Sequence, residues 1–107
     1  AVQSVGEMET ELAVARQALG DMVDCAAHDE PGPETTSRIM TGRTLTARHA
    51  IRAVEKAMEA AGGAGFYRKT GLERIFRDIQ AARYHPLQEK AQARLAGRLA
   101  LGLPIDG

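Results

Sequence analysis

Residues 62–65, with the sequence GGAG, form the stretch of this chain best suited to binding chemistry. Three glycines in four positions permit backbone angles that other residues avoid, and they let a ligand approach the main chain. Arg68 and Lys69 follow, and a new helix is expected to begin at Thr70. Backbone N–H groups, two cations and a helix N-terminus together favour an anion such as a pyrophosphate. The alternative is a tight turn that only ends one helix.

The histidines are the other candidates for chemistry. His85 follows Tyr84 and directly precedes a proline. A neutral imidazole at this helix end could act as a base near pH 7. It could equally cap the next helix or stack on Tyr84. His28 and His49 show no metal-ligand spacing with each other or with Cys25, so we expect no metal site.

The composition indicates one helical domain covering residues 1–107. Apolar content comes from Ala, Leu, Ile, Val and Met, with two Tyr, two Phe and no Trp, which favours helices over a sheet. Fourteen basic residues balance fourteen acidic ones, which argues against nucleic acid or an anionic membrane as the main partner. No signal peptide or membrane-spanning segment is recognisable, so we expect a cytoplasmic protein. Cys25 lies near the apolar seam of the first helix, so we expect its thiol to be buried and unreactive. Because the chain begins at Ala1, we expect it to be a piece of a longer protein.

Apolar periodicity predicts four helices and no strand. The helices are expected at about 2–28, 34–61, 71–84 and 86–101. Short connections imply antiparallel neighbours, and hence an all-α, up-down helical bundle. The first helix carries a heptad-like apolar seam. Its members are Val5, Met8, Leu12, Ala15, Leu19, Met22 and Ala26.

Three local signals concern helix ends and interiors. Gly62 is placed to end the second helix in the left-handed conformation. Thr70 and Glu73 have the spacing of a capping box for the third helix. Gly42 lies inside the second helix, where glycine costs about 1 kcal/mol relative to alanine.

Arginines recur every four or five residues along the second helix. They are Arg38, Arg43, Arg48 and Arg52. A solvated or salt-bridged face is the main interpretation of such a run. An anion-binding groove for a phosphate-bearing ligand is the alternative.

The order small-Gly-Gly-x-Gly-aromatic at residues 61–66, followed by Leu-Glu-Arg-x-x-Arg-Asp at residues 72–78, carries a family resemblance. It resembles the C-terminal helical domain of the acyl-CoA dehydrogenase superfamily, well from about residue 35 to residue 103. The resemblance implies a bundle of long helices that follows an N-terminal helical domain and a middle β-domain. It also implies a homodimer or homotetramer in which the glycine turn reaches the FAD of a neighbouring subunit. Gly62, Gly63 and Gly65 would then be the FAD contacts, in an enzyme that oxidises the CH–CH group of an acyl-CoA.

Two positions depart from the family pattern. Glu59 occupies a place where the family often has Gln, so its carboxylate must point away from a flavin pyrophosphate or pair with a cation. Pro86 occupies the place of the catalytic Glu of many members, which leaves the base undetermined. The pair Arg77-Asp78 matches the family's Arg-Asp pair, and we expect it to pin the third helix ionically.

Two alternatives to the dehydrogenase remain open. Flavin-dependent monooxygenases of the same fold are similar in this region and carry a His at the spacing of His85, where it would be catalytic. A helical oligomerisation module without catalysis is the other alternative. We expect this chain to be inactive alone, because it lacks the middle domain and most of the flavin site. We expect it to self-associate, because a piece of such a bundle exposes apolar surface.

Overall fold

The computed structural model describes residues 2–62, 71–81 and 86–105. Within these ranges it contains four helices and no strand, as predicted. The helices are α1 (Val2–His28), α2 (Pro33–Ala61), α4 (Leu72–Gln80) and α5 (Pro86–Leu101). The predicted bounds agree to within one residue for α1, α2 and α5, because glycine and proline mark the ends of these helices. The predicted extension of α4 to residue 84 lies partly outside the described residues.

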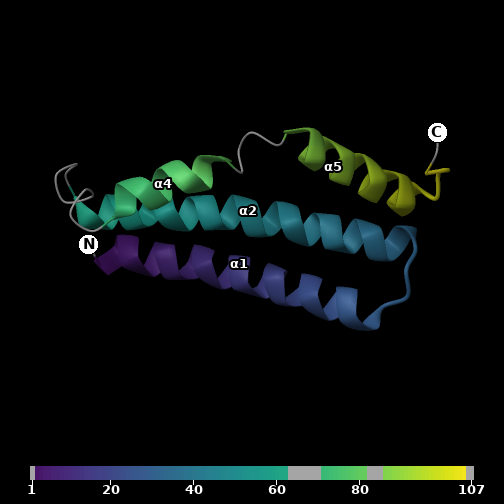
Figure 1. Cartoon of the computed structure of the whole chain (residues 1–107), viewed down its shortest axis with the longest axis horizontal. Helices are drawn as coiled ribbons and strands as arrows, with labels where there is room; N and C mark the ends of the chain where they lie inside the picture. The colour runs from purple at the N-terminus through teal and green to yellow at the C-terminus, as the bar shows by residue number, and fades with distance from the viewer. Residues whose placement is uncertain (1, 63–70, 82–85, 106–107) are drawn as a thin grey trace.

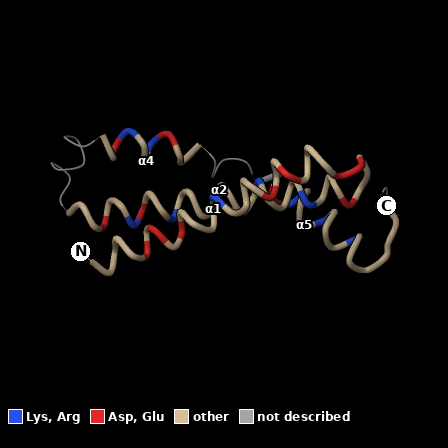
Figure 2. The backbone as a smooth tube through the Cα atoms, turned by 90° about the horizontal axis from the view of Figure 1, so that it is seen from below, with Lys and Arg blue, Asp and Glu red and all other residues tan. Residues whose placement is uncertain are grey.

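α2 is the central helix, and α1, α4 and α5 all pack on it. α1 runs antiparallel to α2 along one side, while α4 and α5 follow one another along the other side (Figure 1). Seen from below, α4 and α5 diverge to opposite sides of the α1–α2 pair (Figure 2). The radius of gyration is 16.7 Å, compared with about 13 Å for a compact domain of this length. The all-α, antiparallel prediction is confirmed, and the arrangement is elongated and open.

The buried apolar side chains of the described helices are few, and most of them are small. Ala15, Ala18 and Cys25 contribute from α1, and Ile51 and Ala53 from α2. Small side chains at a helix contact let the two backbones approach closely. The core is therefore a narrow seam between two long helices.

Gly42 is a point of close contact between α1 and α2. A Cβ atom at this position would collide with the Met22 side chain and lie 3.3 Å from the Ala18 carbonyl oxygen. The close packing of α1 offsets the cost of about 1 kcal/mol that glycine carries inside a helix. Gly42 is therefore needed for the close packing of α1 on α2.

The predicted seam of α1 is rotated away from the face that packs on α2. The buried positions Ala15, Ala18 and Cys25 form one line, whereas Val5 and Leu19 are 43% and 51% exposed. At about 100° per residue, the predicted seam is centred roughly 75° from the buried line. The prediction is wrong for Val5, Leu19 and Ala26, which are exposed, whereas Ala15 is buried and Met22 lies against Gly42 of α2.

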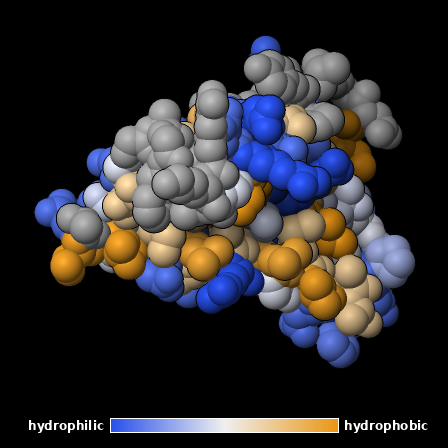
Figure 3. Space-filling model, turned by 60° about the vertical axis from the view of Figure 1, so that its left-hand side comes forward, coloured by the Kyte–Doolittle hydropathy of each residue, from blue (hydrophilic) through white to orange (hydrophobic). Residues whose placement is uncertain are grey.

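Apolar side chains consequently remain on the surface of the described helices. Leu19 and Val23 of α1 are more than half exposed, and Ile75 of α4 is 49% exposed. Figure 3 shows apolar side chains interspersed with polar ones on one face of the molecule. This matches the expected exposed apolar surface, while self-association stays a prediction.

Ion pairs of the α2 arginines tie the helices together. Arg38 donates two hydrogen bonds to the Asp21 carboxylate of α1, at 3.0 and 2.5 Å. Arg48 Nε lies 2.8 Å from Glu89 Oε1 of α5. The prediction of a salt-bridged face is confirmed for Arg38 and Arg48. Arg43 makes no ion pair within the part of the chain that the structure describes.

The contact at Gly42 predicts opposite effects of one substitution at two glycines. Gly42→Ala should lower the free energy of unfolding by about 1–3 kcal/mol, because the new methyl group overpacks the seam. Gly20→Ala is the matched control, since a Cβ there meets nothing within 4 Å, and it should stabilise α1 by about 0.5–1 kcal/mol. Urea denaturation of both variants measures the difference. A Gly42→Ala variant as stable as Gly20→Ala would contradict the contact.

The Asp21–Arg38 pair predicts a pH dependence of stability. Hydrogen bonding from Arg38 holds the pKa of Asp21 below its ordinary value of 3.8. Ionised Asp21 therefore stabilises the folded state above that value, and the stabilisation is lost as the pH falls through the folded pKa. The Tm difference between wild type and Asp21→Asn should be small, because the pair is exposed, and should vanish once the pH has fallen well below 3.8. A difference that persists unchanged at acidic pH would argue against this interaction.

Candidate functional site

Gly62 is the one predicted cofactor residue that lies among the described residues. It directly follows α2 and is exposed, at the end of the molecule where α1 begins and α4 packs (Figure 1). Gly63, Gly65 and His85 lie outside the described residues, so their roles remain predictions. The site is therefore built from Gly62 and the side chains that surround the end of α2.

The backbone of Gly62 has φ 92° and ψ −134°. The positive φ confirms why glycine stands here, but this ψ lies outside the left-handed helical region, so the predicted cap conformation is wrong. The Gly62 N–H bonds to the Met58 carbonyl oxygen at 3.3 Å and closes the helix. A Cβ at Gly62 would meet no atom of the described residues within 4 Å. Gly62 therefore offers open space beside the main chain and keeps its N–H within the helix cap.

Three charged residues beside this end form what we call the Lys56 cluster: Glu7, Lys56 and Glu59. Lys56 Nζ lies 2.9 Å from Glu7 Oε2 of α1 and 3.2 Å from Glu59 Oε2 in α2. The hydrogen bond from Lys56 lowers the pKa of Glu7, and the bonds to Glu7 and Glu59 raise the pKa of Lys56. Of the two alternatives for Glu59, pairing with a cation is the one observed. Sequence reasoning did not identify Lys56, although its i, i+3 spacing to Glu59 was the available signal.

The start of α4 differs from the predicted capping box. The N-cap residue is Gly71, with φ 79° and ψ 2°, and α4 begins at Leu72. The Gly71 carbonyl oxygen accepts a hydrogen bond from the Ile75 N–H at 3.2 Å. The box required Thr70 as the N-cap with Glu73 three residues later, so that register is wrong. Glycine at positive φ turns the chain into the helix one residue later than predicted.

The pair Arg77-Asp78 forms no ion pair with another helix in the part of the chain that the structure describes. Asp78 lies 3.9 Å from Arg74 of the same helix, and both side chains are largely exposed. Arg77 is exposed and makes no ion pair with another helix in the described ranges. The expected ionic pinning is therefore not seen among the described residues, and Leu72 and Phe76, half-buried, belong to the helix that packs on α2.

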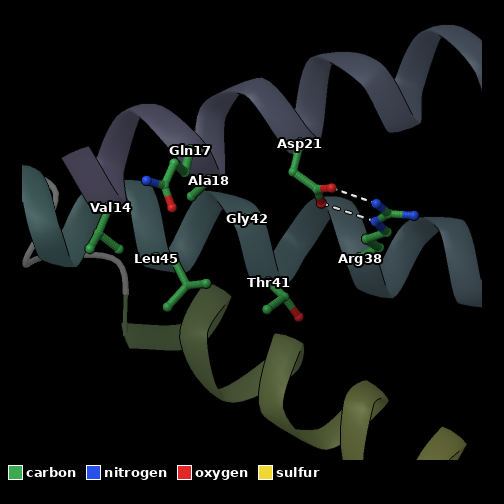
Figure 4. Close-up of a pocket in the computed structure, with 8 residues that line it drawn as sticks. All are labelled: Val14, Gln17, Ala18, Asp21, Arg38, Thr41, Gly42 and Leu45. Atoms are coloured by element: carbon green, nitrogen blue, oxygen red, sulfur yellow. Dashed lines mark hydrogen bonds and ion pairs between the residues drawn. The ribbon is translucent and has the colours of Figure 1, made fainter. Parts of the chain in front are cut away.

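A groove of about 480 Å³ lies on the α1–α2 pair, away from Gly62 (Figure 4). The groove is lined by Val14, Gln17, Ala18, Asp21, Arg38, Thr41, Gly42 and Leu45. The Asp21–Arg38 ion pair crosses it at one end, and the Thr41 hydroxyl accepts a hydrogen bond from Gln92 of α5 at 3.0 Å. Its charged groups are already paired with each other, and its remaining walls are mostly apolar. The groove is therefore suited to packing and offers no nucleophile or base.

The remaining titratable groups do not assemble a reactive centre in the described part. No group of three His, Cys, Asp or Glu side chains there could hold a metal ion. His49 Nδ1 lies 2.5 Å from Glu11 Oε2, across the α1–α2 interface. Cys25 is buried and donates to Asp29 at 3.2 Å, and burial raises the pKa of its thiol. An unreactive thiol is therefore supported. No described helix combines the length and apolarity needed to cross a membrane.

Comparison with known proteins places this arrangement in one family. A family model, "Acyl-CoA dehydrogenase, C-terminal domain", matches residues 1–90, so α1 belongs to the shared domain as well. YdbM of Bacillus subtilis (strain 168), named a putative acyl-CoA dehydrogenase, is 32% identical over 91 residues, which are 83% of this chain and 23% of that protein. The oxygenase component of p-hydroxyphenylacetate 3-hydroxylase from Acinetobacter baumannii is 27% identical over 112 residues, covering 99% of this chain and 26% of that protein.

No solved structure matches the chain significantly. The chain spans about a quarter of the length of these two curated relatives. The family match nevertheless covers most of the chain and agrees with its all-α architecture. This chain belongs to the acyl-CoA dehydrogenase C-terminal domain family.

Proposed function

We propose that this chain is the FAD-contacting and oligomerisation domain of an acyl-CoA dehydrogenase-like flavin oxidoreductase. The family match over residues 1–90 is the observation that carries the proposal. Its substrate would be an acyl-CoA, oxidised at the CH–CH group. The chain spans only 23% of the YdbM protein. We therefore propose this activity for the full-length protein that contains the chain. The isolated chain is expected to be inactive.

The geometry at the end of α2 fits this role. Gly62 leaves open space beside the backbone, and the nearby Glu59 carboxylate is paired with Lys56. Gly63 and Gly65 would add further contacts without side chains to obstruct a diphosphate. A bound flavin would supply the redox chemistry, while the protein supplies binding and orientation.

Sharing of FAD between subunits is part of the proposal. Gly62 is exposed at one end of a molecule that is 52 Å long. A ligand at such an end is accessible to a second subunit of a homodimer or homotetramer. We also propose a cytoplasmic location for the assembled enzyme.

A flavin-dependent monooxygenase of the same fold is the second candidate. The match to the oxygenase component from Acinetobacter baumannii favours it, because it extends over 99% of this chain. His85 would then be the base that activates a phenolic or heteroaromatic substrate. The dehydrogenase remains the first candidate because of the higher identity to YdbM and the family match.

Two assays on the purified full-length protein decide between the candidates. In the first assay, we expect the protein to reduce a dye when an acyl-CoA is supplied. In the second, we expect no oxygen uptake when reduced flavin and a phenol are supplied. His85→Gln should leave dye reduction unchanged, whereas it should slow a hydroxylation by about 10²–10⁴-fold. Oxygen uptake that depends on His85 would replace the dehydrogenase with the monooxygenase. A protein that retains no FAD through purification would leave only the oligomerisation role.

A further inference from the structure

The face of α1 that points away from α2 carries large apolar side chains in contact with solvent. Leu19 and Val23 are 51% and 63% exposed. At about 100° per residue, Gly20 lies on the side of α1 opposite the buried line that contains Ala15 and Cys25. α4 and α5 lie beyond α2 as seen from α1 (Figure 1). This face is therefore uncovered within the described part of the chain.

We call this surface the outer face of α1 and define it by Arg16, Leu19, Gly20, Val23 and Asp24. These residues line a groove of about 540 Å³ along the helix. A Cβ at Gly20 would meet no atom of the described residues within 4 Å. A second helix could therefore lie against the outer face without displacing any described side chain at Gly20.

Two charges of opposite sign flank Gly20 at equal distances on this face. Arg16 lies four residues before Gly20 and Asp24 four residues after it, so each is about 6 Å from Gly20 along the helix axis. Arg16 is exposed and makes no ion pair among the described residues. Asp24 pairs at 3.1 Å with His28 of the same helix, and both of these side chains are more than 70% exposed. Neither charge is used to hold α1 on α2.

A face with this pattern is complementary to itself in an antiparallel pair. When a two-fold axis passes beside Gly20 of both copies, residues equally far before and after Gly20 lie level with one another across the pair. Arg16 of each copy is then level with Asp24 of the other copy, which gives two attractive charge pairs. Leu19 and Val23 of both copies meet on one flank of the same contact and are removed from water.

We propose that two copies of this protein associate through the outer face of α1, as an antiparallel pair of α1 helices centred on Gly20. This inference rests on the oligomerisation part of the proposed function and names the surface that performs it. A partner unrelated to this chain would need no charges placed symmetrically about one residue. The symmetry of Arg16 and Asp24 about Gly20 therefore favours a second copy as the occupant.

Disulfide crosslinking of a Gly20→Cys variant of the full-length protein tests the proposal, because a residue beside the axis meets its own equivalent. Cα atoms that oppose each other across two packed helices lie within the reach of about 4–7 Å that a disulfide needs. A mild oxidant should therefore convert most of this variant to a covalent dimer on a non-reducing gel.

Gly6→Cys is the matched control. Gly6 is also exposed on α1, and a Cβ there would likewise meet no described atom within 4 Å. In the proposed pair, the two copies of Gly6 lie about 40 Å apart, because each is about 21 Å from the axis. The Gly6→Cys variant should therefore crosslink no more than wild type.

Charge reversal in the Gly20→Cys background tests the register. Arg16→Asp should slow crosslinking by about tenfold at low salt, because both charge pairs become repulsive. Asp24→Arg should slow it to a similar extent for the same reason. The double variant Arg16→Asp/Asp24→Arg should crosslink at the original rate, since both pairs form again with their signs exchanged.

A Gly20→Cys protein that retains FAD but does not crosslink would overturn the inference and leave the proposed function intact. Labelling of the same variant with a maleimide then identifies the reason: a protected thiol means that another segment of the full-length protein covers the face, and a reactive thiol means that the face is open. A double variant that crosslinks as slowly as the single variants would also overturn the inference. A protein that crosslinks through Gly20→Cys but retains no FAD would support the interface and reject the proposed flavin site.

Discussion

The close contact between α1 and α2 at Gly42 is the constraint on which the rest of this structure depends. With no side chain at Gly42, the Met22 side chain and the Ala18 carbonyl can approach the α2 backbone. α4 and α5 both pack on α2, so their positions follow from that of the α1–α2 pair. Ion pairs then fix this pair towards each end: Asp21 with Arg38 near the connection, and Glu7 with Lys56 near Gly62. The contact at Gly42 and the ion pairs towards both ends therefore fix the position of α1 along α2.

The helices could be predicted from the sequence, but their contact faces could not. Pro33, Gly62 and Gly102 mark helix ends. Proline lacks a backbone N–H and glycine tolerates a positive φ, so these ends can be recognised from the sequence alone. The face of α1 depends on which partner it meets, and Ala18 and Cys25 are buried against α2 although Leu19 is the larger residue. A periodic pattern records all apolar neighbours of a helix together. The predicted seam of α1 therefore combined residues that face α2 with exposed apolar residues. The exposed residues have no neighbouring helix within the described part of the chain.

The candidate site was predictable to a similar extent. The glycines and Glu59 stood out because they match or depart from a family pattern, and the pairing of Glu59 with a cation was one of the predicted alternatives. Lys56 was missed, because a lysine on a helix surface has no distinctive signal until its partners are known. The capping box at Thr70 failed for a local reason, since Gly71 takes the positive φ at the N-cap. The Gly62 N–H is already bonded to the Met58 carbonyl oxygen, so under the proposed function Gly62 would offer space rather than a hydrogen-bond donor.

The central claim is that the glycine turn at the end of α2 approaches FAD through its missing side chains. The amount of FAD bound by a Gly63→Val variant of the full-length protein, measured beside the Tm of its apo form, tests this most directly. Gly62→Ala is the control for backbone strain, because φ 92° should cost alanine about 1–3 kcal/mol of stability. The account predicts that Gly63→Val loses its FAD while its apo form keeps the helix content and Tm of wild type. Retention of FAD by a destabilised Gly63→Val protein would contradict it.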